Sequence, residues 1–267
     1  MPELSHDLSS FPEAPAPVVA GHYEARLASS SQEVLQAQKL RYQVMYAEKG
    51  GHPDLHKVKN KADIDQWDEC AHHIVVVDNK VKPSKVVGTL RLVSNLSLAE
   101  EQLFYTEEAF DLSALRNRYH SMLELGRFCI DPSGRNGAIL MLIWKYAMQF
   151  IVTNKIEVMF GCASFPGTDI NEHRDVLTYL YNNNLAPEEL MPTPVTSHVK
   201  LADIMAREID FDDATKGIPT LLRGYLKLGA KTSDTAIIDP VFNTTFICIY
   251  VDAKSMLSEN TTLVTAR

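Results

Sequence analysis

Hydrophobic and polar positions follow each other along the chain in an order that predicts one mixed α/β domain. Short runs rich in Val, Ile and aromatic residues predict strands at 22–29, 72–78, 86–94, 121–131, 155–164 and 242–252. Helical spacing of apolar residues predicts helices at 30–49, 139–154, 170–184 and 218–229, with shorter helical pieces within 97–120. The order β-α-β-β-α-β-α-β-α-α-β predicts a single central sheet flanked by helices.

The two ends of the chain and one internal stretch lack this periodicity. Residues 1–21, rich in Pro, Ala and Ser, predict a flexible N-terminal tail, and residues 254–267 predict a C-terminal tail. The folded domain is therefore expected at 22–253. Within it, the proline-containing stretch 185–218 is predicted to be an insertion.

Composition and charge narrow the class of protein. Of 267 residues 45% are hydrophobic, enough for a large core, and the net charge of −8 argues against general nucleic-acid binding. The four widely spaced cysteines form no CxxC pair, so we expect neither a zinc site nor a disulfide framework. The chain shows no export signal and no apolar run of about 18 residues, which predicts a cytoplasmic protein without a transmembrane helix.

A glycine-containing turn, PSGRNGA, joins the strand at 121–131 to the helix at 139–154. The start of a helix offers unpaired N–H groups and a partial positive charge, which suit a phosphate. Gly137 allows close approach of the backbone to a ligand, and Arg135 can pair with phosphate oxygens. Taken alone, the same residues are explained equally well by a plain strand-to-helix turn.

An acid-rich segment, DIDQWDE, precedes the strand at 72–78. Such a run is most often a solvated loop. In a functional interpretation, Asp65 and Asp68 hold a cationic amine substrate and Trp67 covers it. Both interpretations stay open at this point.

Charged residues inside predicted strands require partners. Arg91 lies in one strand, and Glu124 and Arg127 lie in another. Glu124 and Arg127 are three residues apart, so they face opposite sides of a regular strand unless a bulge intervenes. A structural salt bridge and a functional pair are equally compatible with this spacing.

The succession of hairpin, strand, turn, long helix, strand and later helix resembles the GNAT acyltransferase fold. In that fold, the turn after the fourth strand binds the pyrophosphate and pantetheine of acyl-CoA. GYLKLGA at 224–230 is similar to the GNAT signature Tyr-x-x-x-Gly-Phe, with Tyr225 and Gly229 in register and Ala230 replacing the aromatic residue. PSGRNGA departs from the usual Gln/Arg-x-x-Gly-x-Gly/Ala turn, which favours a donor with one phosphate instead of a pyrophosphate.

Two branches that use acyl carrier protein carry related motifs. The acyl-homoserine lactone synthases have an early helical Arg like Arg41, an Asp-x-x-Asp like 65–68, a strand Arg like Arg91 and a Glu-x-x-Arg-Phe like 124–128. The closer resemblance, over roughly 23–252, is to the L-ornithine N-alpha-acyltransferases of ornithine-lipid synthesis. The segments that carry it include LRYQVMY, DQWDECAHHIVV, ELGRFCIDPSGRNGAILMLIW, FGCASFPGTD, NNLAPEEL and LLRGYLKLGA.

This resemblance implies transfer of a 3-hydroxyacyl group from acyl carrier protein to the alpha-amine of L-ornithine, giving lyso-ornithine lipid. Glu124 is the candidate general base, and Tyr225 is the candidate acid for the leaving thiolate. The implied acceptor-binding residues are Arg41, Asp65, Trp67, Asp68, Arg91, Arg127 and Ser164. The phosphopantetheine arm of the donor is expected at Phe128, Ile130, Arg135, Asn136, Gly137 and Ala138. No metal and no permanently bound cofactor is expected.

Acyl carrier protein is strongly acidic, so an enzyme of net charge −8 needs a local basic dock. The candidates are Arg135, Lys145, Arg223, Lys227 and Lys231. The product is amphipathic, which leaves room for peripheral contact with the cytoplasmic face of the inner membrane. The alternatives are transfer to lysine, glutamine or glycine, an acyl-homoserine lactone synthase, and a non-catalytic acyl-binding protein.

Overall fold

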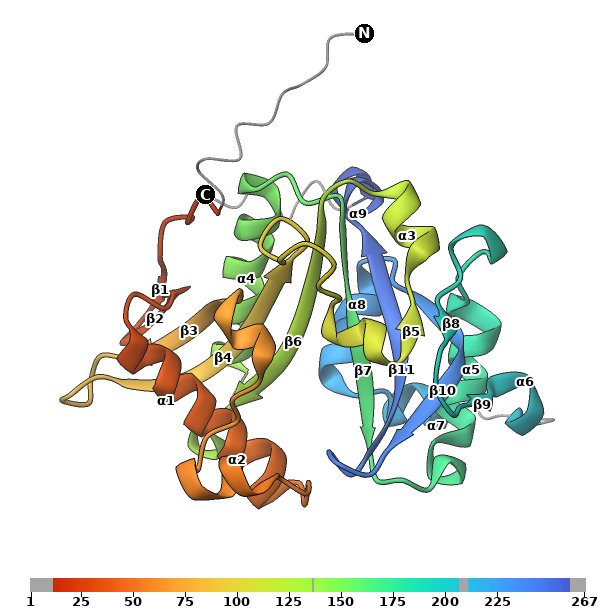
Figure 1. The fold of residues 1–267 in the computed structure, drawn as a ribbon, viewed down its shortest axis with the longest axis horizontal. Coiled ribbons are helices and arrows are strands. Elements are labelled where there is room, and N and C mark those ends of the chain that lie inside the picture. Colours follow the sequence, from red (N-terminus) through yellow and green to blue (C-terminus); the bar gives the residue numbers. More distant parts are fainter. Residues whose placement is uncertain (1–11, 136, 207–210, 260–267) are drawn as a thin grey trace, which may run out of the picture.

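A nine-stranded sheet organises the computed structural model, which describes residues 12–135, 137–206 and 211–259 (Figure 1). Its strand order is β1-β2-β3-β4-β6-β7-β11-β10-β9. The strands are β1 Val18–Ala20, β2 Tyr23–Leu27, β3 His72–Asp78, β4 Lys85–Ser94, β6 Met122–Ile130, β7 Val158–Pro166, β9 Val199–Lys200, β10 Lys231–Asp239 and β11 Thr244–Asp252. Neighbouring strands are antiparallel, except that β6 and β7 are parallel. A small second sheet pairs β5 Phe110–Asp111 with β8 Thr193–Pro194.

Helices cover both faces of the sheet, with α1 in front of it and α4 behind it in Figure 1. Side chains of β3 alternate between the two layers: Ile74 and Val76 pack in the same core as α4, while Val75 and Val77 pack in the same core as α1. The helical elements are α1 Ser31–Tyr42, η2 Gln43–Glu48, α2 Leu55–Asn60, η3 Gln66–Glu69, η4 Tyr105–Glu108, α3 Ser113–Arg118, η5 Pro132–Gly134, α4 Ala138–Thr153, η6 Ile170–His173, α5 Arg174–Asn184, η7 Glu188–Leu190, α6 Leu201–Ile204, α7 Phe211–Gly217, α8 Thr220–Lys227 and α9 Ala253–Glu259.

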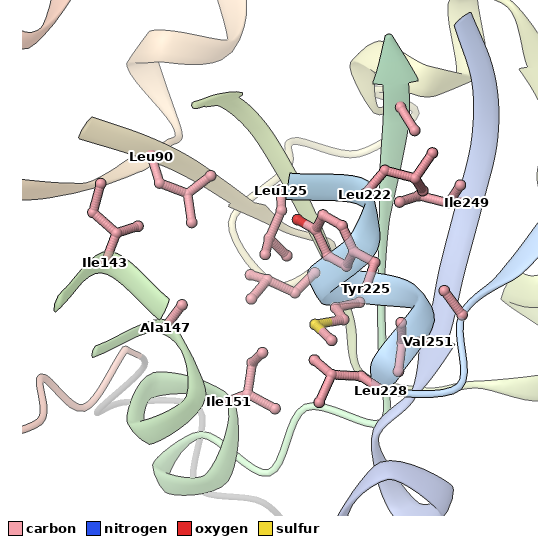
Figure 2. Packing of buried hydrophobic residues seen from close by; sticks show 14 of the residues in the cluster. Leu90, Leu125, Ile143, Ala147, Ile151, Leu222, Tyr225, Leu228, Ile249 and Val251 are labelled. Atoms are coloured by element: carbon pink, nitrogen blue, oxygen red, sulfur yellow. The ribbon is translucent and has the colours of Figure 1, made fainter. Parts of the chain in front are cut away.

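The helix α4 connects the two parallel strands and supplies much of the core. It begins after Gly137, whose φ of 86° lies in the left-handed region that glycine adopts without strain. Figure 2 shows Tyr225 and Leu222 of α8 between Ile143 of α4 on one side and Ile249 of β11 on the other. This packing fixes α8 against the back of the sheet, close to the junction of β6 and β7.

The predicted mixed, mostly antiparallel sheet with flanking helices is confirmed, but several elements differ from the predictions. Of the helical pieces expected within 97–120, η4 and α3 are present, but residues 97–104 form no helix, and Glu101 there has a φ of 65°. The strand β10 was not predicted, because Thr232, Ser233 and Thr235 break its apolar pattern although all three are buried. The Thr232 hydroxyl donates to the carbonyl oxygen of Asn184, and the Ser233 hydroxyl donates to the carbonyl oxygen of Thr235.

The segments predicted to be tails and an insertion contain regular structure. Val18–Ala20, placed in the N-terminal tail, form β1 and pair with β2. Residues 254–259, placed in the C-terminal tail, belong to α9. The stretch 185–218 contains β8, β9 and α6, and β9 extends the main sheet by pairing with β10.

Candidate active site

The two parallel strands β6 and β7 stop pairing with each other partway along their length. They pair at Met122 with Val158, at Leu123 with Met159 and at Glu124 with Phe160. Beyond Glu124 both strands continue for six residues, to Ile130 and Pro166, without pairing with each other. The strand β6 stays bonded to β4 on its other edge, so its backbone faces an opening on the β7 side.

The end of β6 directs backbone groups into this opening. The N–H of Asp131 donates to the carbonyl oxygen of Val87 on β4. Because N–H directions alternate along an antiparallel strand, the N–H of Ile130 points away from β4 and toward the opening. Arg135 donates to the carbonyl oxygen of Ile130 at 3.3 Å, so that carbonyl is already engaged.

Two glycines shape the point where the strands separate. A Cβ atom on Gly161 of β7 would collide with the carbonyl oxygen of Leu125 on β6, so only glycine allows this close approach. A Cβ atom on Gly126 would meet no atom within 4 Å. Gly126 lies two residues after Glu124 on the same face of β6, so open space adjoins Glu124.

A bulge in β6 brings Glu124 and Arg127 to the same side of the sheet. Arg91 pairs with Gly126 and Thr89 pairs with Cys129, so two residues of β6 lie opposite one residue of β4. Arg127, within the bulge, has a φ of 56°. The bulge that the sequence required for the two charged groups to share a face is therefore present.

Both charged groups contact the 3₁₀ turn η4, which lies over this face. The carboxylate of Glu124 accepts hydrogen bonds from the N–H groups of Tyr105 at 3.1 Å and Thr106 at 2.7 Å, and from the Thr106 hydroxyl at 2.6 Å. The guanidinium carbon of Arg127 lies 4.5 Å from the ring centroid of Tyr105. Glu124 is 3% exposed, and burial raises its pKa although the hydrogen bonds from Thr106 act in the opposite direction.

Arg41 is the centre of a buried network of ion pairs. Its Nε is 2.9 Å from Asp63 Oδ2, and its Nη1 and Nη2 each lie 2.8 Å from an oxygen of Asp68. It also donates to the carbonyl oxygen of Asp63. Arg41 and Asp63 are both 0% exposed, so in this structure neither reaches a substrate.

Arg91 and Arg127 extend the same network to Asp65. Arg91 Nη1 lies 2.5 Å from Asp65 Oδ1 and 3.2 Å from Asp68 Oδ1. Arg127 bonds Asp63 through Nε at 3.1 Å and Asp65 through Nη2 at 3.0 Å. The predicted acceptor-side arginines and aspartates are thus brought together, but their charges are directed at one another.

The pKa values of the aspartates reflect their pairing with the arginines. Burial by itself would raise the pKa of Asp63, yet Arg127, Arg41 and Lys57 outweigh it and lower that pKa to about 2. The pKa of Asp68 is also lowered, because its contacts with Arg41 and Arg91 outweigh burial. Both carboxylates are therefore ionised at neutral pH, and the network favours a role in ordering the loop that carries Asp65 and Asp68.

Trp67 lies in surroundings different from those the sequence suggested. Trp67 is 5% exposed, donates from Nε1 to the carbonyl oxygen of Leu103 at 2.9 Å, and packs edge-on against Tyr105. It is part of the core beneath the loop instead of a cover over a ligand. Ser164 is exposed on β7, where it pairs with Phe246 of β11.

The turn after β6 has its own internal bonds. Asp131 accepts from the N–H and hydroxyl of Ser133 and pairs with Lys85 at 2.6 Å. Gly137 and Ala138 are exposed at the start of α4, and Phe128 is half-buried. Arg135 is paired with Glu48 at 2.5 Å, so its cation already has a partner. Asn136 lies outside the described residues.

Tyr225 lies on the opposite side of the sheet from Glu124. It is 8% exposed, its ring packs edge-on against Trp144 with centroids 4.8 Å apart, and burial raises its pKa strongly. Figure 2 places its ring beside Leu125, whose side chain points to the back of the sheet. Glu124 and Tyr225 thus do not share one face of the sheet.

Two residues near Glu124 were missed by the sequence analysis. Thr106 holds the Glu124 carboxylate, but a threonine in a loop gives no signal of such a contact. Glu108, in the same turn, is exposed and has no hydrogen bond or ion pair among the described residues. Burial, Asp65 and Glu124 raise the pKa of Glu108, while Arg127 acts in the opposite direction.

No three His, Cys, Asp or Glu side chains within the described ranges converge so as to hold a metal ion. In the same part of the chain, no helix is long and apolar enough to cross a membrane.

Comparison with known proteins identifies relatives of this chain. A model of the acetyltransferase (GNAT) domain matches residues 40–145, in agreement with the GNAT-like fold. A protein of Rhodobacter capsulatus named L-ornithine N(alpha)-acyltransferase is 34% identical over 250 residues, 92% of this chain and 95% of its own length. One of the same name from Agrobacterium fabrum is 30% identical, over 88% of this chain and 83% of its own length. A solved N-acyl amino acid synthase from uncultured soil microbes has 12% identity and a TM-score of 0.46, covering 91% of this chain and 95% of that one.

Proposed function

Because the chain belongs to the L-ornithine N(alpha)-acyltransferase family, we propose that it transfers a 3-hydroxyacyl group from acyl carrier protein to the alpha-amine of L-ornithine. The product would be lyso-ornithine lipid, in the first step of ornithine-lipid synthesis. The observation that carries this proposal is the sequence similarity to relatives of that name, which extends over nearly the whole chain. That the chain is an acyltransferase follows from its family, and the acceptor and donor are the proposed parts.

The opening between β6 and β7 suits a direct transfer. The ornithine amine, once it has lost a proton, attacks the thioester carbonyl, so that a C–N bond forms and the C–S bond breaks. Glu124 lies where the opening begins, and its raised pKa favours proton acceptance, directly or through water. The N–H of Ile130 can stabilise charge on the carbonyl oxygen, and Tyr225 can return a proton to the leaving thiolate.

Glu108 is the carboxylate best placed to hold the side-chain ammonium of ornithine. Asp65 and Asp68 were the earlier candidates, but each is already paired with arginine. Glu108 lacks such a partner among the described residues and shares its turn with the groups that bind Glu124. Asp65 and Glu124 raise the pKa of Glu108, while Arg127 lowers it, so Glu108 lies among charged groups of both signs.

A basic surface for the carrier protein is supported on the α8 side. Arg223 and Lys227 line a cavity of about 490 Å³ between α5, α7 and α8, together with Lys216. Arg223 also donates to the carbonyl oxygens of Thr215 and Ile218, which fixes the end of α7. Arg135 is a weaker candidate for docking, because its cation is paired with Glu48.

The test is an assay of the purified protein with 3-hydroxyacyl carrier protein or acetyl-CoA as donor and a panel of acceptors. Ornithine, lysine, glutamine, glycine and S-adenosylmethionine separate the alternative acceptors, and mass spectrometry identifies each product. We expect acylated ornithine from the carrier-protein donor. Turnover with acetyl-CoA alone would exclude the proposed donor, and a different preferred amine would exclude the proposed acceptor.

The role of Glu124 is tested by comparing Glu124→Gln with Thr106→Val. General-base catalysis contributes roughly 10²–10⁴-fold, so Glu124→Gln is expected to lower kcat by at least about 100-fold while the protein stays folded. Thr106→Val removes the hydroxyl contact but keeps the carboxylate, and should cost much less. Equal losses in the two variants would assign Glu124 to positioning of the η4 turn.

A further inference from the structure

The short helix α2 does not bury any of its side chains in the core. Its side chain at Leu55 is 88% exposed and that at Val58 is 46% exposed, and no residue of the helix is buried. The two apolar side chains are three residues apart and therefore lie on the same side of the helix. The helix is nevertheless well formed, because the Asp54 side chain accepts from the N–H of Lys57 at 2.9 Å.

Lysines flank these apolar side chains along the sequence of a protein that is acidic overall. Lys49, Lys59 and Lys61 are exposed and have no ion pair among the described residues, whereas Lys57 is directed toward Asp63 at 3.5 Å. The acidic residue within 49–61 is Asp54, which caps the helix. The segment is therefore a local cationic patch on a chain of net charge −8.

The segment is anchored next to the opening between β6 and β7. Glu48, which precedes it, pairs with Arg135 of the turn after β6 at 2.5 Å. The N–H of His52 donates to the carbonyl oxygen of Val241, in the connection between β10 and β11, at 2.6 Å. Figure 1 shows α2 projecting at the lower edge of the molecule, away from the sheet. Because both ends of the segment are anchored, the exposed side chains of Leu55 and Val58 are held facing the solvent.

We propose that α2 and its flanking lysines dock the protein on an anionic lipid surface, with Leu55 and Val58 inserted at the headgroup level. Exposed apolar side chains with lysines nearby in the sequence match such an interface. There, the burial of apolar area and the attraction of lysines to anionic headgroups both favour binding. An acidic protein partner would use the lysines but leaves the 88% exposure of Leu55 without a matching surface. This places the opening of the active site beside the membrane.

The test is co-sedimentation of the full chain with phosphatidylcholine vesicles that contain or lack phosphatidylglycerol, at low and high salt, without substrates. We expect binding to the anionic vesicles that weakens with salt. Leu55→Glu with Val58→Glu should lower vesicle partitioning at least about tenfold, and Lys59→Gln with Lys61→Gln should lower it about fivefold per lysine. Thermal unfolding should be unchanged, because these side chains are exposed.

Val81→Glu is the matched control. Val81 is 45% exposed on the β3–β4 turn between Lys80 and Lys82, so this variant adds one negative charge at an apolar side chain elsewhere, against two in the Leu55 and Val58 variant. It should bind vesicles as the wild type does. Equal loss in this control, or full binding by the Leu55 and Val58 variant, would overturn the proposal. Vesicle binding needs no turnover, so its failure is distinct from failure of the proposed acyl transfer.

Discussion

Replacing Arg41 by alanine separates a structural role of the ion network from a role in binding the acceptor. Arg41→Ala removes the bonds to both oxygens of Asp68 and to Asp63, and leaves these carboxylates buried with fewer partners. Removing one partner of a buried ion pair costs about 3–5 kcal/mol. In a domain of this size, each kcal/mol of lost stability lowers the Tm by about 2–4 °C. The expected fall in Tm is therefore roughly 6–20 °C.

The network also predicts how stability depends on pH. The pKa of Asp63 is lowered from 3.8 to about 2, which corresponds to about 2 kcal/mol of stabilisation. A lowered pKa stabilises the folded state above the unfolded pKa, so this contribution is present at neutral pH and is lost as the pH falls from about 4 to about 2. In Arg41→Ala the loss on acidification should be smaller, because Asp63 keeps only part of its positive surroundings.

The assay is thermal and urea unfolding of both proteins between acidic and neutral pH, together with ornithine kinetics. Arg135→Ala is the matched control, since its ion pair with Glu48 is exposed and such pairs contribute about 0–1 kcal/mol. Unchanged stability of Arg41→Ala, combined with a large rise in KM for ornithine, would refute the structural assignment and restore Arg41 as an acceptor-binding residue.

Three further variants probe the site itself. Gly126→Val fills the open space beside Glu124 and should block turnover while Tm stays near that of the wild type, so an active variant would show that ligands do not use this space. Glu108→Gln should raise KM for ornithine about tenfold or more, by loss of a charge-assisted contact, and an unchanged KM would exclude Glu108 as the ammonium partner. Tyr225→Phe should fold normally with a lower kcat, and an unchanged kcat would remove Tyr225 as proton donor.

Periodicity predicted those elements whose side chains follow one simple rule. The helix α4 was placed within one residue of its observed ends because its apolar run is long, and β3 and β4 were found because both are rich in Val, with Ile in β3 and Leu in β4. The strand β10 escaped because its hydroxyl residues are buried, which depends on partners far away in the chain.

The motifs pointed to candidate site residues but not to their arrangement. Motif resemblance identified Arg41, Asp68 and Arg127, but pattern alone does not reveal that side chains 27 residues apart, such as Arg41 and Asp68, bond each other. Glu108 was overlooked because two adjacent glutamates in a turn look like ordinary surface. Partner choice among buried charges is a property of the folded structure, so it became visible only there.

The absent side chain of Gly161 sits where β6 and β7 begin to diverge, and this position gives it leverage over the whole site. From Glu124, its last residue paired with β7, to Ile130, β6 extends for about 20 Å at about 3.3 Å per residue. It acts as one arm of a wedge whose vertex is the contact of Gly161 with the Leu125 carbonyl. A methyl group at the vertex would rotate the arms apart, and the displacement would grow with distance along them. A substitution that leaves every charged residue untouched is thus expected to alter the site most at its far, wide end.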